Sequence, residues 1–215
     1  MIANVLATGS SGNAVLYGGN ILVDVGVPYR TISDYVDDIR LVLLTHIHGD
    51  HFNKSTIRRL AINRPTLRFA CGEWLYNDLI ECGVLVRNID VMSANEVYNY
   101  PGLCRISPFE LYHDVPNFGW RIFFTDNYSI FHATDTFTLD GIEAVGYDLY
   151  AIEHNYSEKH VFADIEYDKS MGKYAYQEDA IKVHLSFERA QEFFEENRDF
   201  HSQLIKLHIS SRYKE

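Results

Sequence analysis

Hydrophobic and polar residues alternate through much of the first 25 positions of the chain. Three runs, at residues 2–8, 14–17 and 21–25, have the two-residue period that is typical of β-strands. The second and third runs are separated by Gly18-Gly19-Asn20, which favours a tight hairpin turn. The chain is therefore expected to begin with short strands, two of which form a hairpin.

The spacing of apolar residues then lengthens to three and four positions, which is typical of helices. Pro28 fits the first turn of a helix that continues to about Asp38. Ser55 is suited to cap a second helix, which is expected to end at Pro65. The elements expected next are a strand at 66–71 and a helix at 73–82 with Gly83 as its stop.

The second half of the chain is richer in short apolar runs than in helical patterns. Several strand-like runs lie between residues 84 and 124, and further runs occupy 130–134, 149–153 and 204–208. Before the last of these, Ser186 is positioned to cap a helix. Strands followed by an alternation of strands and helices predict an α/β (α+β) fold, a four-layer αβ/βα sandwich with two facing sheets.

The composition fits one domain over residues 1–215, since 47% of the residues are hydrophobic and 23% are charged. No stretch approaches the roughly 20 apolar residues that span a membrane, and no signal peptide is recognisable, so we expect no membrane partner. The three cysteines lack CxxC spacing and are interpreted as thiols of a reducing, cytoplasmic compartment. A net charge of −11 disfavours non-specific binding to long polyanions.

The clearest chemical signal is the stretch from Leu41 to His51, in which an apolar run ends in a cluster of polar ligand types. Imidazole nitrogens and carboxylate oxygens suit zinc, iron or manganese, and four of them lie within six residues. They can serve two neighbouring ions if the chain turns sharply, which Gly49 is expected to permit. The candidate ligands of this stretch are His46, His48, Asp50 and His51.

The segment Thr45-His46-x-His48-x-Asp50-His51 resembles the signature of the metallo-β-lactamase superfamily, in the form shared by glyoxalase II and RNase Z. True β-lactamases of this fold usually lack the last histidine, so His51 points away from antibiotic hydrolysis. The sequence Gly9-Ser-Ser-Gly-Asn13 after the first strand is similar to a WalJ-type subgroup of bacterial and phage nucleases. The resemblance implies that the predicted sandwich is a metallo-β-lactamase fold.

The resemblance also implies further metal ligands in distant segments. His113 matches the third histidine position, Asp135 matches the bridging carboxylate of the dinuclear members, and His208 matches the last ligand of RNase Z-like enzymes. Asp24 and Asp114 are expected to brace the ligands from behind. The cofactor implied is a pair of divalent ions, with zinc preferred over manganese or iron. The complete expected ligand set is His46, His48, Asp50, His51, His113, Asp135 and His208.

A second pair of residues is assigned to proton transfer by the same resemblance. His184 begins a His-Leu-Ser segment, and Glu153 ends the preceding strand-like run. Glu153 would orient His184, which would protonate the departing oxygen or hold the phosphate, while a hydroxide bridging the metals attacks. Asp50 is counted with them as catalytic. His154 is an alternative to either residue, because the sequence alone does not choose between them.

Three features allow more than one interpretation. The loop 9–13 is either a turn or a phosphate cradle. The basic residues of 54–68 are either a solvated helix face or a surface for a phosphate-bearing substrate. The aromatic and acidic segment 156–182 is a lid, a homodimer contact or a surface on which a base stacks.

The leading hypothesis is a dinuclear metal phosphodiesterase that acts on nucleic acid or on nucleotides, cyclic nucleotides included. The alternative is an acyl, thioester or lactone hydrolase of glyoxalase II or lactonase type, because an activated water attacks either kind of centre. A third hypothesis, a binding module without activity, conflicts with the complete ligand set.

Overall fold

The alternating runs at the start of the chain form the antiparallel edge of a six-stranded sheet. The computed structural model describes residues 3–213, so residue 2 of the first expected strand lies outside the described residues. The chain divides into two compact units, one of residues up to 96 together with 115–118, and one of 97–114 together with the residues from 119 onward. The expectation of a single domain over 1–215 stays a prediction.

The sheet of the first unit is mixed. Its first three strands are antiparallel, as the predicted hairpin requires, and the remaining strands are parallel to the third. Its strands, in their order across the sheet, are β1 (Ala3–Ala7), β2 (Ala14–Tyr17), β3 (Ile21–Val23), β4 (Leu41–Leu43), β5 (Arg68–Cys71) and β6 (Ile89–Val91).

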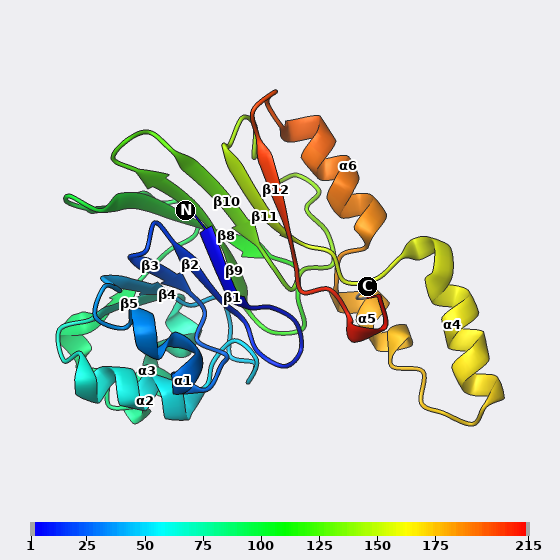
Figure 1. Cartoon of the computed structure of the whole chain (residues 1–215), viewed down its shortest axis with the longest axis horizontal. Coiled ribbons are helices and arrows are strands. Elements are labelled where there is room, and N and C mark those ends of the chain that lie inside the picture. The colour runs from blue at the N-terminus through cyan, green and yellow to red at the C-terminus, as the bar shows by residue number, and fades with distance from the viewer. Residues whose placement is uncertain (1–2, 214–215) are drawn as a thin grey trace. The chain divides into compact units, whose positions relative to one another are not determined.

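The helices of the first unit pack on one face of this sheet (Figure 1). Alternate strand residues such as Val42 and Phe69 share a buried apolar cluster with Ile57, Leu60 and Leu79 of the helices. The helices are α1 (Tyr29–Ile32), α2 (Lys54–Asn63) and α3 (Tyr76–Glu81), with 3-10 turns η1 (Ser33–Tyr35), η2 (Glu73–Leu75) and η3 (Val86–Asn88).

Two expectations about these helices need correction. The helix expected from Pro28 to Asp38 is a four-residue α-helix followed by a 3-10 turn that ends at Tyr35. The cap of α2 is Asn53 and not Ser55, because the Asn53 side chain accepts a hydrogen bond from the amide of Thr56 at 3.0 Å. The stop at Gly83 is confirmed, since Gly83 follows the C-cap residue Cys82 and adopts a φ of 86°.

The second unit contains the other six-stranded sheet, which is also mixed. β10 is antiparallel to β9 and parallel to β11, and β12 is parallel to β11. The first two residues of β9 belong to the first unit. The strands, in order across the sheet, are β12 (Gln203–Leu207), β11 (Leu149–Glu153), β10 (Ser129–Ala133), β9 (Asn117–Phe124), β8 (Cys104–Leu111) and β7 (Tyr98–Tyr100).

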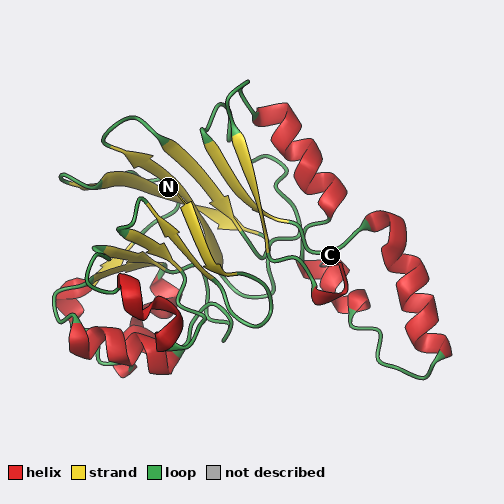
Figure 2. Ribbon diagram, viewed as in Figure 1, coloured by secondary structure: helices red, strands yellow, loops and turns green. Residues whose placement is uncertain are grey.

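One long helix of this unit, α6 (Phe187–Asn197), packs along β11 (Figure 1). Ser186 caps it as predicted, by accepting the amide hydrogen of Arg189 at 3.1 Å. The segment between β11 and α6 forms α4 (Glu158–Ser170) and α5 (Gln177–Val183), and Figure 2 shows α4 farther from the strands of this sheet than α6. The described chain ends in a 3-10 turn, η4 (Ser211–Tyr213).

Two predictions drawn from composition can be compared with the structure. Cys71, Cys82 and Cys104 are all buried free thiols. Among the described residues, no helix has the length and apolar character needed to cross a membrane.

The cap of α2 gives a direct test of the local structure. Replacing Asn53 with Ala should lower the free energy of unfolding by about 1 kcal/mol, because the Thr56 amide loses its acceptor. The exposed Ser55→Ala should change it by less than about 0.5 kcal/mol. Urea unfolding of both variants measures the difference, and an equal loss in the two would contradict the assignment of the cap.

Candidate functional site

The histidine stretch of the first unit is organised around the buried carboxylate of Asp24. This residue follows β3 and accepts the backbone amide and the hydroxyl of Thr45 at 2.9 and 3.0 Å. It also lies 2.6 Å from Nδ1 of His51. Burial raises the pKa of Asp24 above its ordinary value, although His51 and the bonds from Thr45 oppose the rise. The carboxylate therefore contacts Thr45 and His51 of the stretch, and its role behind metal ligands stays a prediction.

These contacts define the partners of the ring nitrogens of His51 and His46. Because His51 gives its Nδ1 hydrogen to Asp24, its Nε2 carries the lone pair, which lies 2.8 Å from the side-chain amide nitrogen of Asn13. His46 has its Nδ1 2.9 Å from the Thr45 hydroxyl, which itself donates to Asp24. The ring centroids of His46 and His51 are 4.2 Å apart, and those of His46 and His48 are 4.8 Å apart. An imidazole whose Nδ1–H is held by a carboxylate or a hydroxyl has the tautomer that is common among metal-binding histidines.

The glycine that the histidine turn requires is Gly26 rather than Gly49. Gly49 does not have a left-handed φ, and a side chain there would meet open space. At Gly26, in contrast, a Cβ atom would lie 1.6 Å from the carbonyl oxygen of Asp50. The expectation about Gly49 was therefore wrong, and the constraint comes from a segment that approaches the turn from β3.

Asn13 is a contact residue that the sequence did not reveal. Its amide nitrogen lies 3.1 Å from the carbonyl of Asp50 and 2.8 Å from Nε2 of His51, and its side-chain oxygen accepts the amide of Gly9. The amide of Gly12 is bonded to the carbonyl of Gly9, and the backbone amide of Asn13 to the carbonyl of Asp50. Because these amides are used internally, the structure favours the turn interpretation of residues 9–13 over a phosphate cradle.

The basic residues on and after α2 are used mostly within the first unit. Lys54 lies 2.6 Å from Asp78, and Arg68 forms an ion pair with Asp90. The Arg64 guanidinium donates to the backbone carbonyls of Val36 and Ile39. These contacts favour a structural role for the cluster over phosphate binding.

The second unit contains a cluster centred on Glu153, which is fully buried at the end of β11. One of its carboxylate oxygens lies 2.6 Å from Nδ1 of His184 and 3.3 Å from Nδ1 of His208. The other accepts the backbone amides of Thr136 and Leu185 at 2.9 and 3.2 Å. A single carboxylate thus holds together the three chain segments that carry Asp135, His184 and His208.

The electrostatics of this cluster favour an ionised pair. Burial raises the pKa of Glu153, but the neighbouring His184 and His208 outweigh it, so the pKa lies below its ordinary value. Burial lowers the pKa of His184, but Glu153 and Asp135 outweigh it in the opposite direction. The rings of His184 and His208 are stacked, with centroids 5.2 Å apart.

Asp135 follows β10 and turns back toward the same two imidazoles. Its Oδ1 lies 3.6 Å from Nδ1 of His184 and 3.6 Å from Nε2 of His208, and its Oδ2 accepts the Thr134 hydroxyl. Asp135, Glu153, His184 and His208 each offer one ligand atom within 4.8 Å of the others. This set of imidazoles and carboxylates fits a transition-metal ion or zinc.

Three of the expected site residues have backbones in the left-handed region. The φ angles are 61° at Asp24, 56° at Asp135 and 49° at His208. Among the described non-glycine residues, the two others with such angles are asparagines, which adopt them more readily. Left-handed backbone at residues other than Gly and Asn is frequent at functional sites, where the surrounding structure holds it in place.

His113 lies in the second unit, in the loop after β8. Its Nδ1 donates to the backbone carbonyl of Val183 at 3.1 Å, and its Nε2 lies 3.1 Å from the carboxylate of Asp114. Asp114 therefore contacts Nε2 of His113, whereas a residue that braces the ring from behind would contact Nδ1. Burial lowers the pKa of His113. Its ring centroid is 5.6 Å from that of His184.

Two further residues clarify the cluster. His154 directs its Nδ1 to the backbone carbonyl of Ile152, and its ring lies 6.1 Å from that of Phe187. The contact of His154 with a backbone carbonyl favours a structural role for this histidine, whereas His184 contacts Glu153 directly. Asn155, which no sequence motif distinguishes, has its side-chain nitrogen 3.1 Å both from Nδ1 and from the carbonyl oxygen of His208.

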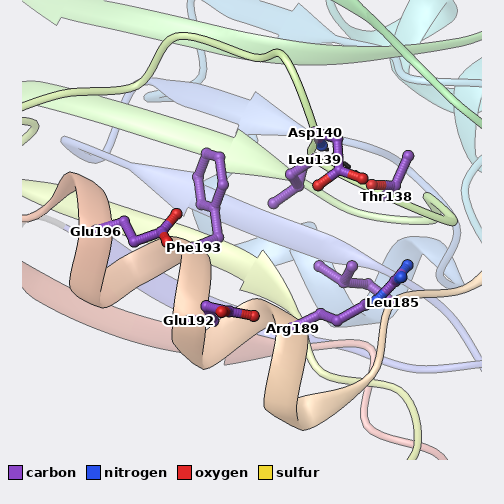
Figure 3. A pocket seen from close by; sticks show the side chains of 8 residues that line it. All are labelled: Thr138, Leu139, Asp140, Leu185, Arg189, Glu192, Phe193 and Glu196. Carbon is purple, nitrogen blue, oxygen red and sulfur yellow. Dashed lines mark hydrogen bonds between the residues drawn. The ribbon is translucent and has the colours of Figure 1, made fainter.

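A pocket of the second unit lies between α6 and the loop after Asp135 (Figure 3). Its apolar wall includes Leu185, whose backbone amide is bonded to Glu153. Because three carboxylates and one guanidinium line it, the pocket is poorly suited to a phosphate. Its lining consists of Thr138, Leu139, Asp140, Leu185, Arg189, Glu192, Phe193 and Glu196.

Sequence comparison gives one family match. The family model described as beta-lactamase superfamily domain matches residues 20–209 of the chain. A comparison with functionally curated proteins gives no significant match.

Several solved structures have the same fold. The short form of human tRNase Z superimposes with a TM-score of 0.69 at 16% identity, and the alignment covers 100% of this chain and 95% of that one. The metallo-β-lactamase fold protein YhfI from Bacillus subtilis gives 0.71 at 16% identity, covering 97% and 85%. A diphosphatase of the PhnP family gives 0.68 at 15% identity, covering 97% and 85%. These similarities confirm the predicted α/β metallo-β-lactamase fold, with two mixed sheets flanked by helices.

Asp24 provides a test of the first half of the site. Asp24→Ala should lower the free energy of unfolding by about 3 kcal/mol or more, because it leaves buried donors of Thr45 and His51 without an acceptor. Asp37→Ala, at an exposed position of the same unit, should change it by less than about 0.5 kcal/mol. Urea unfolding at neutral pH compares them, and similar midpoints for the two variants would contradict the role of Asp24.

Proposed function

Because the chain belongs to the β-lactamase superfamily, we propose that it is a metal-dependent hydrolase and, more narrowly, a phosphodiesterase. Its substrates are nucleic acids or nucleotides, cyclic nucleotides included. Two of the structures with the same fold are a tRNase Z, which is named for its action on tRNA, and a diphosphatase. They support the choice of a phosphoryl centre over an acyl centre.

The proposed cofactor is a pair of divalent metal ions, with zinc preferred and manganese or iron as alternatives. Nitrogen and carboxylate donors of this kind accept all three metals. When bound, such ions supply Lewis acidity, which activates water near neutral pH and offsets the charge of the transition state. The residues proposed to hold them are His46, His48, Asp50, His51, His113, Asp135 and His208, with Asp24 and Asp114 behind or beside the ligands.

The observation that carries the proposal is the contact between Glu153 and His184. A buried carboxylate 2.6 Å from Nδ1 keeps a proton on that nitrogen and stabilises the charged imidazolium. The raised pKa of His184 supports an imidazole that holds its proton more readily than a free histidine does, because Glu153 and Asp135 lie beside it. In the proposed reaction, the Nε2–H of His184 protonates the departing oxygen of the phosphodiester, and Asp50 would help to hold the ions that would supply the activated water.

The alternative is an acyl, thioester or lactone hydrolase that uses the same ligands. A good leaving group of that kind, such as a thiolate, needs little protonation, so a charged histidine beside a buried glutamate gives it less advantage. The Glu153–His184 pair therefore favours the phosphodiesterase, in which an alkoxide must leave, over the thioester hydrolase.

Metal removal and a substrate panel test the proposed class. The protein, stripped with a chelator and reloaded with zinc, manganese or iron, is assayed on bis-p-nitrophenyl phosphate, single- and double-stranded nucleic acids, cyclic nucleotides, a lactone and a glutathione thioester. We expect cleavage of at least one phosphodiester only in the loaded protein. Cleavage confined to the lactone or the thioester would reject the phosphodiesterase, and metal binding well below one ion per chain would reject the hydrolase.

The role of His184 has its own test. His184→Ala should lower kcat for an unactivated phosphodiester by roughly 10²- to 10⁴-fold, because the leaving oxygen loses its proton donor. Cleavage of a thioester or of a nitrophenyl ester should change much less. His160→Ala, an exposed histidine on α4, is the matched control and should leave both rates unchanged. Equal losses on both substrate types for His184→Ala would contradict a proton-donor role.

A further inference from the structure

The Arg-Tyr pair that follows His208 by four residues has no part in the chemistry described above. The Nη2 atom of Arg212 lies 2.9 and 2.8 Å from the two carboxylate oxygens of Asp168, and its Nη1 atom lies 3.4 Å from Asp164. The two acids are four residues apart on α4, so they occupy the same face of that helix. One guanidinium therefore joins the described end of the chain to two turns of α4.

Asp168 is the central residue of this connection. It is buried, and it also accepts a hydrogen bond from the side chain of Gln177, the buried first residue of α5, at 3.1 Å. Burial raises the pKa of Asp168, but the bonds from Arg212 and Gln177 outweigh it and leave the pKa below its ordinary value. Asp168 thus links α4, α5 and the turn at 211–213 through charge-assisted bonds.

Further contacts hold the same turn. The Tyr213 hydroxyl donates to Asp164 at 2.6 Å, and the hydroxyls of Tyr176 and Ser210 are 3.2 Å apart. The Tyr213 ring packs against the apolar cluster that Val161 forms with its neighbours in the α4–α5 segment. The turn is consequently anchored on the helices and not only on its own strand.

His208 lies directly upstream of this anchored turn, in a left-handed conformation that its surroundings must maintain. Asn155 bonds to its ring and its carbonyl, and the amide of Ser210 donates to the carbonyl of Asn155 at 3.1 Å. With Asn155 at one end and Arg212 at the other, the backbone from 208 to 212 has little freedom to relax.

We propose that Arg212 and Asp168 are positioning residues, which lock the turn after His208 onto the α4–α5 segment and thereby fix the His208 imidazole for metal binding. This inference rests on the proposed function in so far as it takes His208 as a metal ligand. It assigns to residues 158–183 a clamping role, distinct from the lid, dimer contact and base-stacking surface considered from the sequence. At its other end, the same segment bonds to His113 through the carbonyl of Val183.

Two kinds of variant separate this role from general packing. Asp168→Asn and Arg212→Gln remove the charged connection, and Arg212→Lys keeps the charge but has fewer donors. Glu178→Gln is the matched control, because it breaks the exposed ion pair between Lys169 and Glu178, which also joins α4 to α5 but does not touch the turn. Thermal unfolding of each full-length variant verifies that it is folded.

The first measurement is amide hydrogen exchange of the metal-free protein. We expect exchange over residues 207–213 to rise at least roughly ten-fold in Asp168→Asn and Arg212→Gln, less in Arg212→Lys, and not at all in Glu178→Gln. Unchanged exchange in the first two variants would overturn the clamp. This readout does not depend on metal, so it remains decisive if the wild type binds none and the proposed function fails.

The second measurement is calorimetric titration of metal-stripped protein with zinc and with manganese. We expect the affinity of the protein for at least one metal ion to fall roughly ten-fold in Asp168→Asn and Arg212→Gln. A loss of this size is typical when a residue that orients a metal ligand is removed. Arg212→Lys should recover part of the affinity, and Glu178→Gln should match the wild type. Wild-type affinities in folded Asp168→Asn and Arg212→Gln, despite increased exchange, would overturn the positioning of His208.

Discussion

A buried carboxylate is tolerated only when several donors satisfy it, and each unit of this chain contains one that sets the geometry around it. Asp24 collects the amide and hydroxyl of Thr45 and the imidazole of His51. Glu153 collects two imidazoles and two backbone amides. The donors cannot shift independently, because moving one leaves a buried charge with an incomplete set of partners. The histidines are thereby tied to the ends of the core strands that carry or precede these carboxylates.

The need to bring side chains against buried partners also accounts for the left-handed backbone at Asp24, Asp135 and His208. Glycine would adopt these angles without cost, but it has no side chain to accept a hydrogen bond or bind a cation. Each position accepts strain of about 1–3 kcal/mol in order to point a functional group back across the end of its strand. The strain is local, and hydrogen bonds such as that from Thr134 to Asp135 hold it in place.

The sequence predicted those parts of the structure that depend on neighbours along the chain. Alternation placed the strands, and the cap at Ser186 and the stop at Gly83 were recognised, because periodicity and capping are local properties. The cap at Asn53 was missed because two polar residues compete for the start of α2, and the choice depends on where its first turn packs. The pairing of Glu153 with His184 was implied by the resemblance, since no local pattern relates residues 31 positions apart.

Contacts from distant segments lay beyond sequence reasoning for the same reason. Asn13 and Asn155 are ordinary polar residues until the fold brings them against His51 and His208. Gly26 is required by the close approach of the Asp50 carbonyl, whereas Gly49, which lies inside the motif, has open space around it. The Val183 carbonyl, bonded to His113, is a backbone group and leaves no trace in the residue type.

The internal pairing of the basic residues around α2 has a consequence for how a polyanion meets this protein. Lys54 and Arg68 are already matched by Asp78 and Asp90, so contact with them would not release many counterions from a nucleic-acid strand. With a net charge of −11, the chain repels extended phosphate backbones at long range. A mononucleotide or short oligonucleotide carries few charges, so it would meet less of this repulsion than a long strand would, and salt would change that repulsion less.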